Sequence, residues 1–246
     1  MKTITTFALF FTGLFTAHAG WYQCYNYTGT VGKSPVTLSI QITNDYFGAA
    51  EKKNLNINGI YQYTKYHTPI RLEGVLDPAT KQLTLYELHQ NSRTATFTLP
   101  FTDTTATGVW TAESGKSVPV QLTFQSKLTD TAVTDRCDSV EILQASTTPD
   151  FYFVGVYAKA AGAQNTVMTA LKVCRKKDGA LVQHIDFSKE TIATGNLMTL
   201  IYDNVTSDSP STVKVSNQYG RVGGQWSLHW NAKKNCFVKA SQPELQ

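Results

Sequence analysis

The first half of the chain alternates apolar and polar side chains. Val36, Leu38, Ile40 and Ile42 are separated by threonine, serine and glutamine. In an extended strand this period of two places the apolar side chains on one face and the polar ones on the other. The pattern therefore predicts a strand with one buried face.

Further short segments carry the same pattern and are separated by turn formers such as Asp77-Pro78 and Glu113-Ser114-Gly115. We expect strands at 55–64, 70–76, 83–88, 94–99, 108–111 and 118–124. Short strands at regular spacing, with turns between them, are typical of an antiparallel meander that closes into a barrel or a sandwich.

The pattern weakens between residues 125 and 150, and we place a domain junction near residue 130. Strand character then resumes at 151–157, 167–173, 181–187, 197–202, 213–215 and 226–230. Asp178-Gly179 is a strong hairpin turn between two of these segments. The sequence therefore predicts an all-β protein of two antiparallel β domains, 20–128 and 129–246.

The start of the chain has the features of a signal peptide. Lys2 precedes the apolar run 7–15, and Ala17-His18-Ala19 follows as a cleavage site. The apolar run is shorter than the roughly 18 residues of a membrane-spanning helix. We expect removal of residues 1–19, with cleavage after Ala19, and a mature protein that is periplasmic or secreted and does not span the membrane.

Composition and charge exclude further classes. Of the 246 residues, 41% are hydrophobic, which is too many for a disordered chain. Lys and Arg total 22 against 18 Asp and Glu, so the net charge is only +4. The basic residues form small clusters at Lys52-Lys53, Arg175-Lys176-Lys177 and Lys233-Lys234. A nucleic-acid-binding protein normally concentrates such charge on one face, so we expect no nucleic-acid partner.

An even number of cysteines behind an export signal predicts two disulfides. The four cysteines are too widely spaced for the paired ligands of a zinc site, and we expect neither a metal nor a cofactor. Cys174 and Cys236 each end an apparent strand beside a lysine-rich turn. We therefore pair those two, which leaves Cys24 with Cys137, and expect a disulfide-braced fold.

Two carboxylates on adjacent predicted strands, Glu73 and Glu87, offer one enzymatic interpretation. Glycoside hydrolysis needs only a pair of carboxyl groups at a suitable separation. In the structural alternative, Glu87 pairs with a basic neighbour such as Arg71 or Arg93. We favour the structural alternative and expect no catalytic residues.

Aromatic side chains offer a second function. A sugar-stacking platform could be built from Tyr61, Tyr63, Tyr66, Trp226 and Trp230. Tyr61 and Tyr63, however, share a face with Leu55 and Ile57, and this arrangement favours packing in the core.

Two parts of the chain resemble known families. The segments 59–63, 70–74 and 83–87 fit G-x-Y-x-Y, I-x-L-x-G and L-x-L-x-E, a β-meander signature of exported bacterial envelope proteins. Residues 173–183, together with 223–230 running on to Phe237, look like the β domain of periplasmic lysozyme-inhibitor-type immunity proteins.

This resemblance implies a soluble, non-enzymatic periplasmic protein that inhibits a peptidoglycan hydrolase, either as a lysozyme inhibitor or as an immunity protein against a lysozyme-like toxin. Candidate partner-binding residues lie in two turns: Arg221, Gly223, Gly224, Arg175, Lys176 and Lys177. A basic loop complements the acidic cleft of a glycosidase, although both turns also suit ordinary hairpins. The alternatives are a carbohydrate-binding or envelope-assembly module without inhibitory activity and, after that, a β-fold glycosidase.

Overall fold

The computed structural model describes residues 22–43, 55–194, 197, 199–219, 222–240 and 244–245. Strands dominate, and one short helix, α1 (Leu200–Asp203), is present in this part of the chain. The all-β prediction is therefore confirmed. Within these residues, no helix has the length and apolar character to cross a membrane. The expected signal peptide, residues 1–19, lies outside the described residues.

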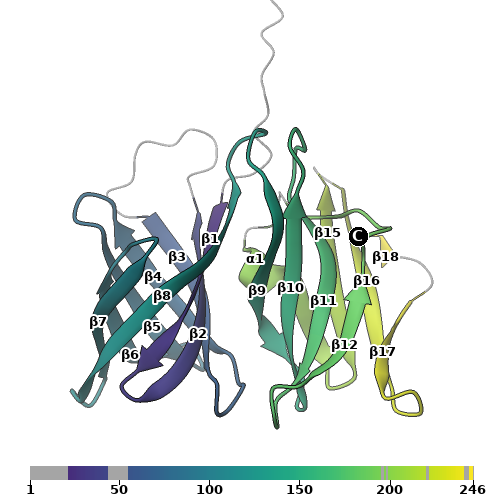
Figure 1. The fold of residues 1–246 in the computed structure, drawn as a ribbon. Helices are drawn as coiled ribbons and strands as arrows, with labels where there is room; N and C mark the ends of the chain where they lie inside the picture. Colours follow the sequence, from purple (N-terminus) through teal and green to yellow (C-terminus); the bar gives the residue numbers. More distant parts are fainter. Residues whose placement is uncertain are drawn as a thin grey trace, which may run out of the picture.

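The first eight strands form a closed antiparallel barrel (Figure 1). They are β1 (Tyr22–Val31), β2 (Ser34–Thr43), β3 (Leu55–Tyr63), β4 (Ile70–Asp77), β5 (Gln82–His89), β6 (Ser92–Pro100), β7 (Thr105–Ala112) and β8 (Ser117–Asp130). Each strand pairs with the next along the chain, and β1 closes the barrel by pairing with β8. The predicted meander is thus a barrel.

The remaining strands form two further antiparallel sheets. The first has the order β12-β11-β10-β9, with β13 paired to β11, and the second has the order β14-β15-β16-β17, with β18 paired to β16. The strands of the first sheet are β9 (Cys137–Thr147), β10 (Phe151–Lys159), β11 (Val167–Arg175), β12 (Leu181–Asp186) and β13 (Ile192–Ala193). Those of the second are β14 (Val205–Ser209), β15 (Thr212–Tyr219), β16 (Val222–Asn231), β17 (Cys236–Lys239) and β18 (Glu244–Leu245). Apolar side chains from both sheets share one core, and we call this unit the sandwich.

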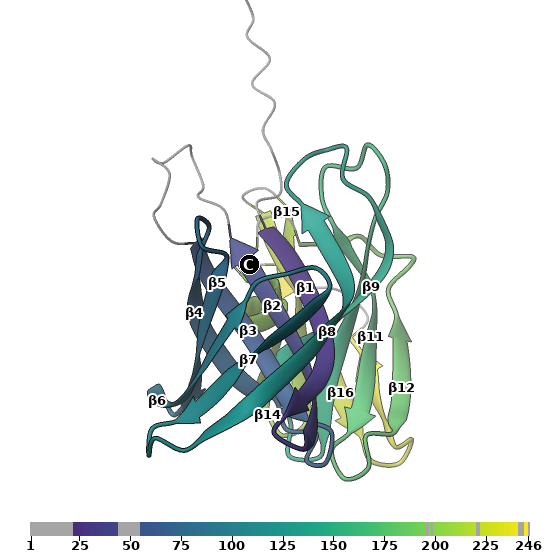
Figure 2. The same ribbon diagram turned by 60° about the vertical axis from the view of Figure 1, so that its left-hand side comes forward.

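The barrel and the sandwich lie side by side, with β9 and α1 against the barrel wall (Figures 1 and 2). Tyr22, Cys24, Ile60 and Leu128 belong to barrel strands but are buried in the core cluster of the sandwich. One wall of the barrel therefore carries apolar side chains on both faces, those inside belonging to the barrel core and those outside to the core of the sandwich.

The alternation in β2 is confirmed, because Val36, Leu38, Ile40 and Ile42 are all buried in the barrel. The middle of its polar face, however, does not meet solvent. Ser39 and Gln41 are buried as well, because this face lies against the sandwich. The Ser39 hydroxyl donates to Asn26 at 2.6 Å, and the Gln41 side-chain oxygen accepts the backbone N–H of Leu200 at 2.8 Å.

A buried ion pair lies where the chain leaves the barrel. The Lys159 ammonium and the Asp130 carboxylate are 2.5 Å apart, and their side chains are 1% and 0% exposed. Lys159 also donates to the carbonyl of Ala132 at 2.8 Å, and Asp130 accepts the backbone N–H of Thr166 at 3.0 Å. These hydrogen bonds and the ion pair itself offset the free-energy cost of removing both charges from water.

All four cysteines are free thiols in the structure, so the expected disulfides are absent and the disulfide-braced fold is unsupported. Cys174 is buried, lies opposite Tyr152 in the register of β10 and β11, and is not paired with Cys236. Cys24 lies close enough to Cys137 for the two to interact electrostatically. Burial raises the pKa of the Cys24 thiol, and the neighbouring Asp130 and Cys137 raise it further.

The buried pair of Lys159 and Asp130 predicts that two lysine substitutions differ strongly in their effect on the free energy of unfolding. Lys159→Met leaves the Asp130 charge buried without its cation, which should lower the free energy of unfolding by about 3–5 kcal/mol. Lys172→Met, which removes a bridge to the half-exposed Glu141, should cost less than about 1 kcal/mol. Urea unfolding measures both, and equal costs would contradict the assigned role of the pair.

Candidate functional site

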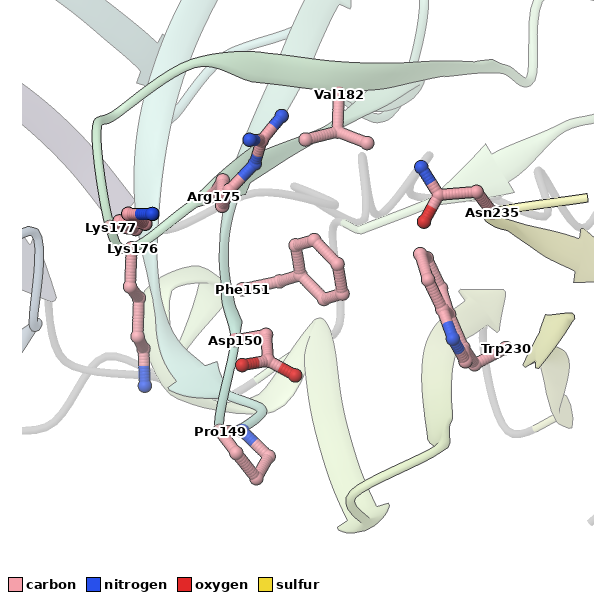
Figure 3. A pocket seen from close by; sticks show the side chains of 9 residues that line it. All are labelled: Pro149, Asp150, Phe151, Arg175, Lys176, Lys177, Val182, Trp230 and Asn235. Carbon is pink, nitrogen blue, oxygen red and sulfur yellow. The ribbon is translucent and has the colours of Figure 1, made fainter. Parts of the chain in front are cut away.

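A pocket of about 530 Å³ opens at one end of the sandwich, where three turns meet (Figure 3). These turns join β9 to β10, β11 to β12 and β16 to β17. The lining residues are Pro149, Asp150, Phe151, Arg175, Lys176, Lys177, Val182, Trp230 and Asn235. We call this cavity the end pocket.

Aromatic rings form one wall of the end pocket. Phe151 begins β10 and Trp230 lies near the end of β16, and their ring centroids are 4.8 Å apart. Phe237 packs edge-on behind both rings, at 5.8 Å from Phe151 and 5.1 Å from Trp230. Phe151 and Phe237 are buried, whereas Trp230 is partly exposed. The aromatic wall is therefore part of the core and cannot easily move.

Positive charge lies on the opposite rim, in the turn that follows β11. We call this segment, residues 175–179, the basic turn. Two backbone hydrogen bonds close it, from Gly179 to the carbonyl of Arg175 at 2.8 Å and from Arg175 to that of Ala180 at 2.9 Å. The Arg175 guanidinium also lies 3.3 Å from the Asp178 carboxylate. The turn is thus rigid before any partner binds.

Lys176 and Lys177 differ in their surroundings. The Lys176 ammonium donates to the Thr147 hydroxyl at 3.0 Å, and its backbone N–H donates to the carbonyl of Asp150 at 2.9 Å. Partial burial lowers the pKa of Lys176, and the nearby Asp150 carboxylate opposes this shift. Lys177 is exposed. Lys176 therefore ties the basic turn to the β9–β10 turn, while Lys177 faces solvent at the rim.

The barrel supports the basic turn from behind. His67, in the turn between β3 and β4, stacks on Tyr152 with ring centroids 5.7 Å apart and planes inclined by 2°. A Cβ on Gly179 would lie 2.4 Å from the His67 ring, and Gly179 has φ +71°. Both the space and the backbone conformation require glycine here.

The predicted partner-binding residues do not form one site. Arg175, Lys176 and Lys177 come together at the end pocket. Gly223 and Gly224 lie at the start of β16, whereas the pocket residue Trp230 lies at its other end. Arg221 lies outside the described residues. Gly223 and Gly224 therefore lie at the opposite end of β16 from the end pocket and the basic triplet.

The carboxylates Glu73 and Glu87 face opposite sides of the barrel wall, so they cannot act as a catalytic pair. Glu73 is exposed on the outside of β4. Its neighbour Leu72 is buried in the barrel and lies opposite Glu87 in the register of β4 and β5. Because adjacent residues of a strand alternate between faces, Glu87 points into the barrel.

Neutral donors surround Glu87. Its carboxylate accepts hydrogen bonds from the Tyr61 hydroxyl, from the Thr94 hydroxyl at 2.9 Å and from the Trp110 indole at 3.2 Å. Burial raises the pKa of Tyr61, and the charge of Glu87 raises it further. The expected arginine partners are engaged elsewhere, since Arg71 stacks on Tyr202 and Arg93 on Tyr86. Glu87 is therefore part of the packing at one end of the barrel.

The predicted aromatic platform is also divided. Tyr61 and Tyr63 pack in the barrel core, as favoured, while Tyr66 is 59% exposed. Only Trp230 of that group lines the end pocket. The sequence analysis did not identify Asp150, Phe151 or Asn235 as site residues. A signal for the first two was present: Pro149-Asp150 marks a turn directly before an apolar run, which places Phe151 at the start of the following strand.

The contact between His67 and Gly179 predicts unequal costs for two similar substitutions. Gly162 also has a positive φ, of +79°, but a Cβ placed on it would meet no atom of the described residues within 4 Å beyond its chain neighbours. Gly162→Ala should therefore cost only the backbone strain, about 1 kcal/mol. Gly179→Ala should cost about 1–3 kcal/mol more, because the His67 ring must move. Urea unfolding tests this, and His67→Ala should remove the difference.

Comparison with known proteins adds no relative. No protein-family model matches the chain, and no curated protein and no solved structure shows significant similarity to it.

Proposed function

We propose that this chain is an exported, non-enzymatic binding protein that inhibits a cell-wall hydrolase, with the basic turn as its main contact. One observation carries the proposal: Arg175, Lys176 and Lys177 are held in a rigid turn on the rim of a pocket with an aromatic wall. The resemblance of this segment to lysozyme-inhibitor-type immunity proteins points to the same class of partner.

Charge complementarity supports the choice of partner. The cleft of a glycosidase that cuts peptidoglycan contains two carboxyl groups. A turn that presents Lys177 and Arg175 to such a cleft would be attracted to it and would be repelled by basic surfaces. The two acidic residues near the turn offset two of its three cations, because Asp178 pairs with Arg175 and Asp150 lies near Lys176. The exposed Lys177 therefore carries the remaining positive charge of the turn.

Rigidity supports the mode of binding. Docking a flexible loop costs conformational entropy, whereas a turn fixed in advance loses little on binding. The basic turn is fixed by its own backbone bonds, by Lys176 against the β9–β10 turn and by His67 of the barrel. The barrel would then serve as a support for the binding surface.

Inhibition can be tested with the chain that begins at Gly20, added to purified peptidoglycan hydrolases while cell-wall clearing is followed. We expect stoichiometric inhibition of at least one hydrolase. Lys177→Glu should weaken it by about tenfold or more, because the substitution places like charges in contact. Lys189→Glu makes the same change at an exposed site beyond the far end of β12 and should have no effect.

Absence of inhibition across a panel that includes animal-type lysozymes and any hydrolase encoded beside this gene would overturn the proposal. Inhibition that survives Lys177→Glu unchanged would keep the function but reject the basic turn as its contact. Clearing of cell walls by the chain alone would show an enzyme.

Export also bears on the cysteines. We propose that in an oxidising compartment Cys24 and Cys137 lose two protons and two electrons to a disulfide-bearing oxidant and join barrel to sandwich. A non-reducing peptide map of the exported protein should then contain a Cys24–Cys137 linkage, with Cys174 recovered as a free thiol. The same chain purified from a reducing cytoplasm is the control. Recovery of Cys24 and Cys137 as thiols in both samples would contradict the pairing.

A further inference from the structure

The end pocket has a chemistry that the proposed contact with a hydrolase uses only in part. Lys177 lies at its rim and faces solvent, whereas the rings of Phe151 and Trp230 and the guanidinium of Arg175 line the cavity (Figure 3). We propose that the end pocket binds a sugar ring that carries a carboxylate. This goes beyond the proposed function, because the site would take a small ligand without any hydrolase present.

The size and the aromatic wall fit a sugar. A cavity of about 530 Å³ falls within the common range for small-molecule sites, about 300–1,000 Å³. The apolar face of a pyranose packs on an aromatic ring, and the partly exposed Trp230 offers such a ring. Phe151 and Phe237 hold that indole in place from behind, at centroid distances of 4.8 Å and 5.1 Å. The stacking surface therefore exists before the ligand arrives.

The polar groups of the pocket are separated in a way that would orient the ring. In Figure 3, Phe151 lies between Arg175 on one side and Asp150 on the other. A ligand carboxylate would bind at the Arg175 end and avoid Asp150. Sugar hydroxyl groups donate to carboxylates, so Asp150 would accept hydrogen bonds from the opposite edge of the ring.

Arg175 can serve the ligand while it keeps its own partner. Its guanidinium has five N–H donors, and the contact with Asp178, at 3.3 Å, leaves others available. Planar guanidinium groups bind carboxylates through paired hydrogen bonds, which are stronger than bonds between neutral groups. The amide of Asn235, near Trp230 on the opposite side of the cavity, offers both a donor and an acceptor to a ring substituent.

A pair of matched sugars tests the preference. N-acetylmuramic acid differs from N-acetylglucosamine by one lactyl ether, which supplies the carboxylate. We expect the chain from Gly20 to bind the acid at least about tenfold more tightly than the neutral sugar, measured by ligand-observed NMR or calorimetry. Glucuronic acid and glucose form a second pair, which distinguishes a cell-wall amino sugar from a uronic acid as the source of the ring.

Substitutions place the ligand. Arg175→Gln should remove the advantage of the acid and leave binding of N-acetylglucosamine unchanged, whereas Lys189→Gln should alter neither. The indole N–H signal of Trp230, assigned with Trp230→Phe, should shift on titration, while that of Trp110 in the barrel should not. The titration followed at Trp230 keeps the proposal testable if a variant fails to fold, because it uses the unsubstituted chain.

Equal affinity for the acidic and neutral sugars would overturn the proposal, and so would binding that leaves the Trp230 signal in place. Absence of binding by all four sugars would overturn it as well. None of these results would decide the inhibition assay, because the sugar titrations contain no hydrolase and the inhibition assay contains no free sugar. Failure of the two proposals can therefore be told apart.

Discussion

The burial of one barrel wall against the sandwich is the constraint on which the rest of the structure depends. A barrel strand normally needs one apolar face, but parts of β1 and β2 are buried on both faces, so the polar side chains there, Asn26, Ser39 and Gln41, each need a partner. Asn26 meets this need by bonding to the carbonyl of Glu141 at 2.8 Å, and Ser39 by accepting the backbone N–H of Leu143 at 3.4 Å. Such directional bonds, together with the ion pair of Asp130 and Lys159, fix the relative position of the barrel and the sandwich. Apolar contacts alone would define that position less well.

That fixed packing reaches the candidate site through the turn between β3 and β4. The turn belongs to the barrel, yet His67 stacks on Tyr152 of the sandwich and fills the space beside Gly179. The basic turn consequently has support from three directions: its own backbone bonds, the β9–β10 turn and the barrel. A charged segment held in this way can bind a partner without first being ordered, and this is the physical basis for assigning it a role in recognition.

The alternation of β2 and the turn-rich gaps were enough to predict a β-meander, because a period of two is a local property of the sequence. The burial of the second face of β2 was not predictable. Ser39 and Gln41 have the polarity of solvent-facing residues, and the segments that cover them come from a distant part of the sequence. The sequence could not place Glu73 and Glu87 relative to each other for a related reason. Proximity on adjacent strands says little without the register, and the register places Glu87 opposite Leu72, so the two carboxylates lie on different faces. The end pocket could not be predicted because it is built from both sheets: Phe151, Arg175 and Trp230 lie near the ends of three strands that are far apart in the sequence. The sequence showed the basic triplet and the Pro149-Asp150 turn as local signals, but not that they lie together.

The position of the end pocket follows from the way the sandwich closes. Gln183 of β12 bonds to both backbone groups of Phe237 in β17, at 2.8 Å each, and so joins the edges of the two sheets with a side chain in place of a strand. A side chain joins the two edges at a single point only. Between this point and the turns of the end pocket, none of the described strands fills the space between Val182 and Trp230. Phe151 and Phe237 still need cover there, which the Trp230 ring provides at the cost of remaining partly exposed. An exposed indole beside Arg175 is thus a consequence of the sheet architecture, and the same consequence creates a surface on which a ring with a negative charge can bind.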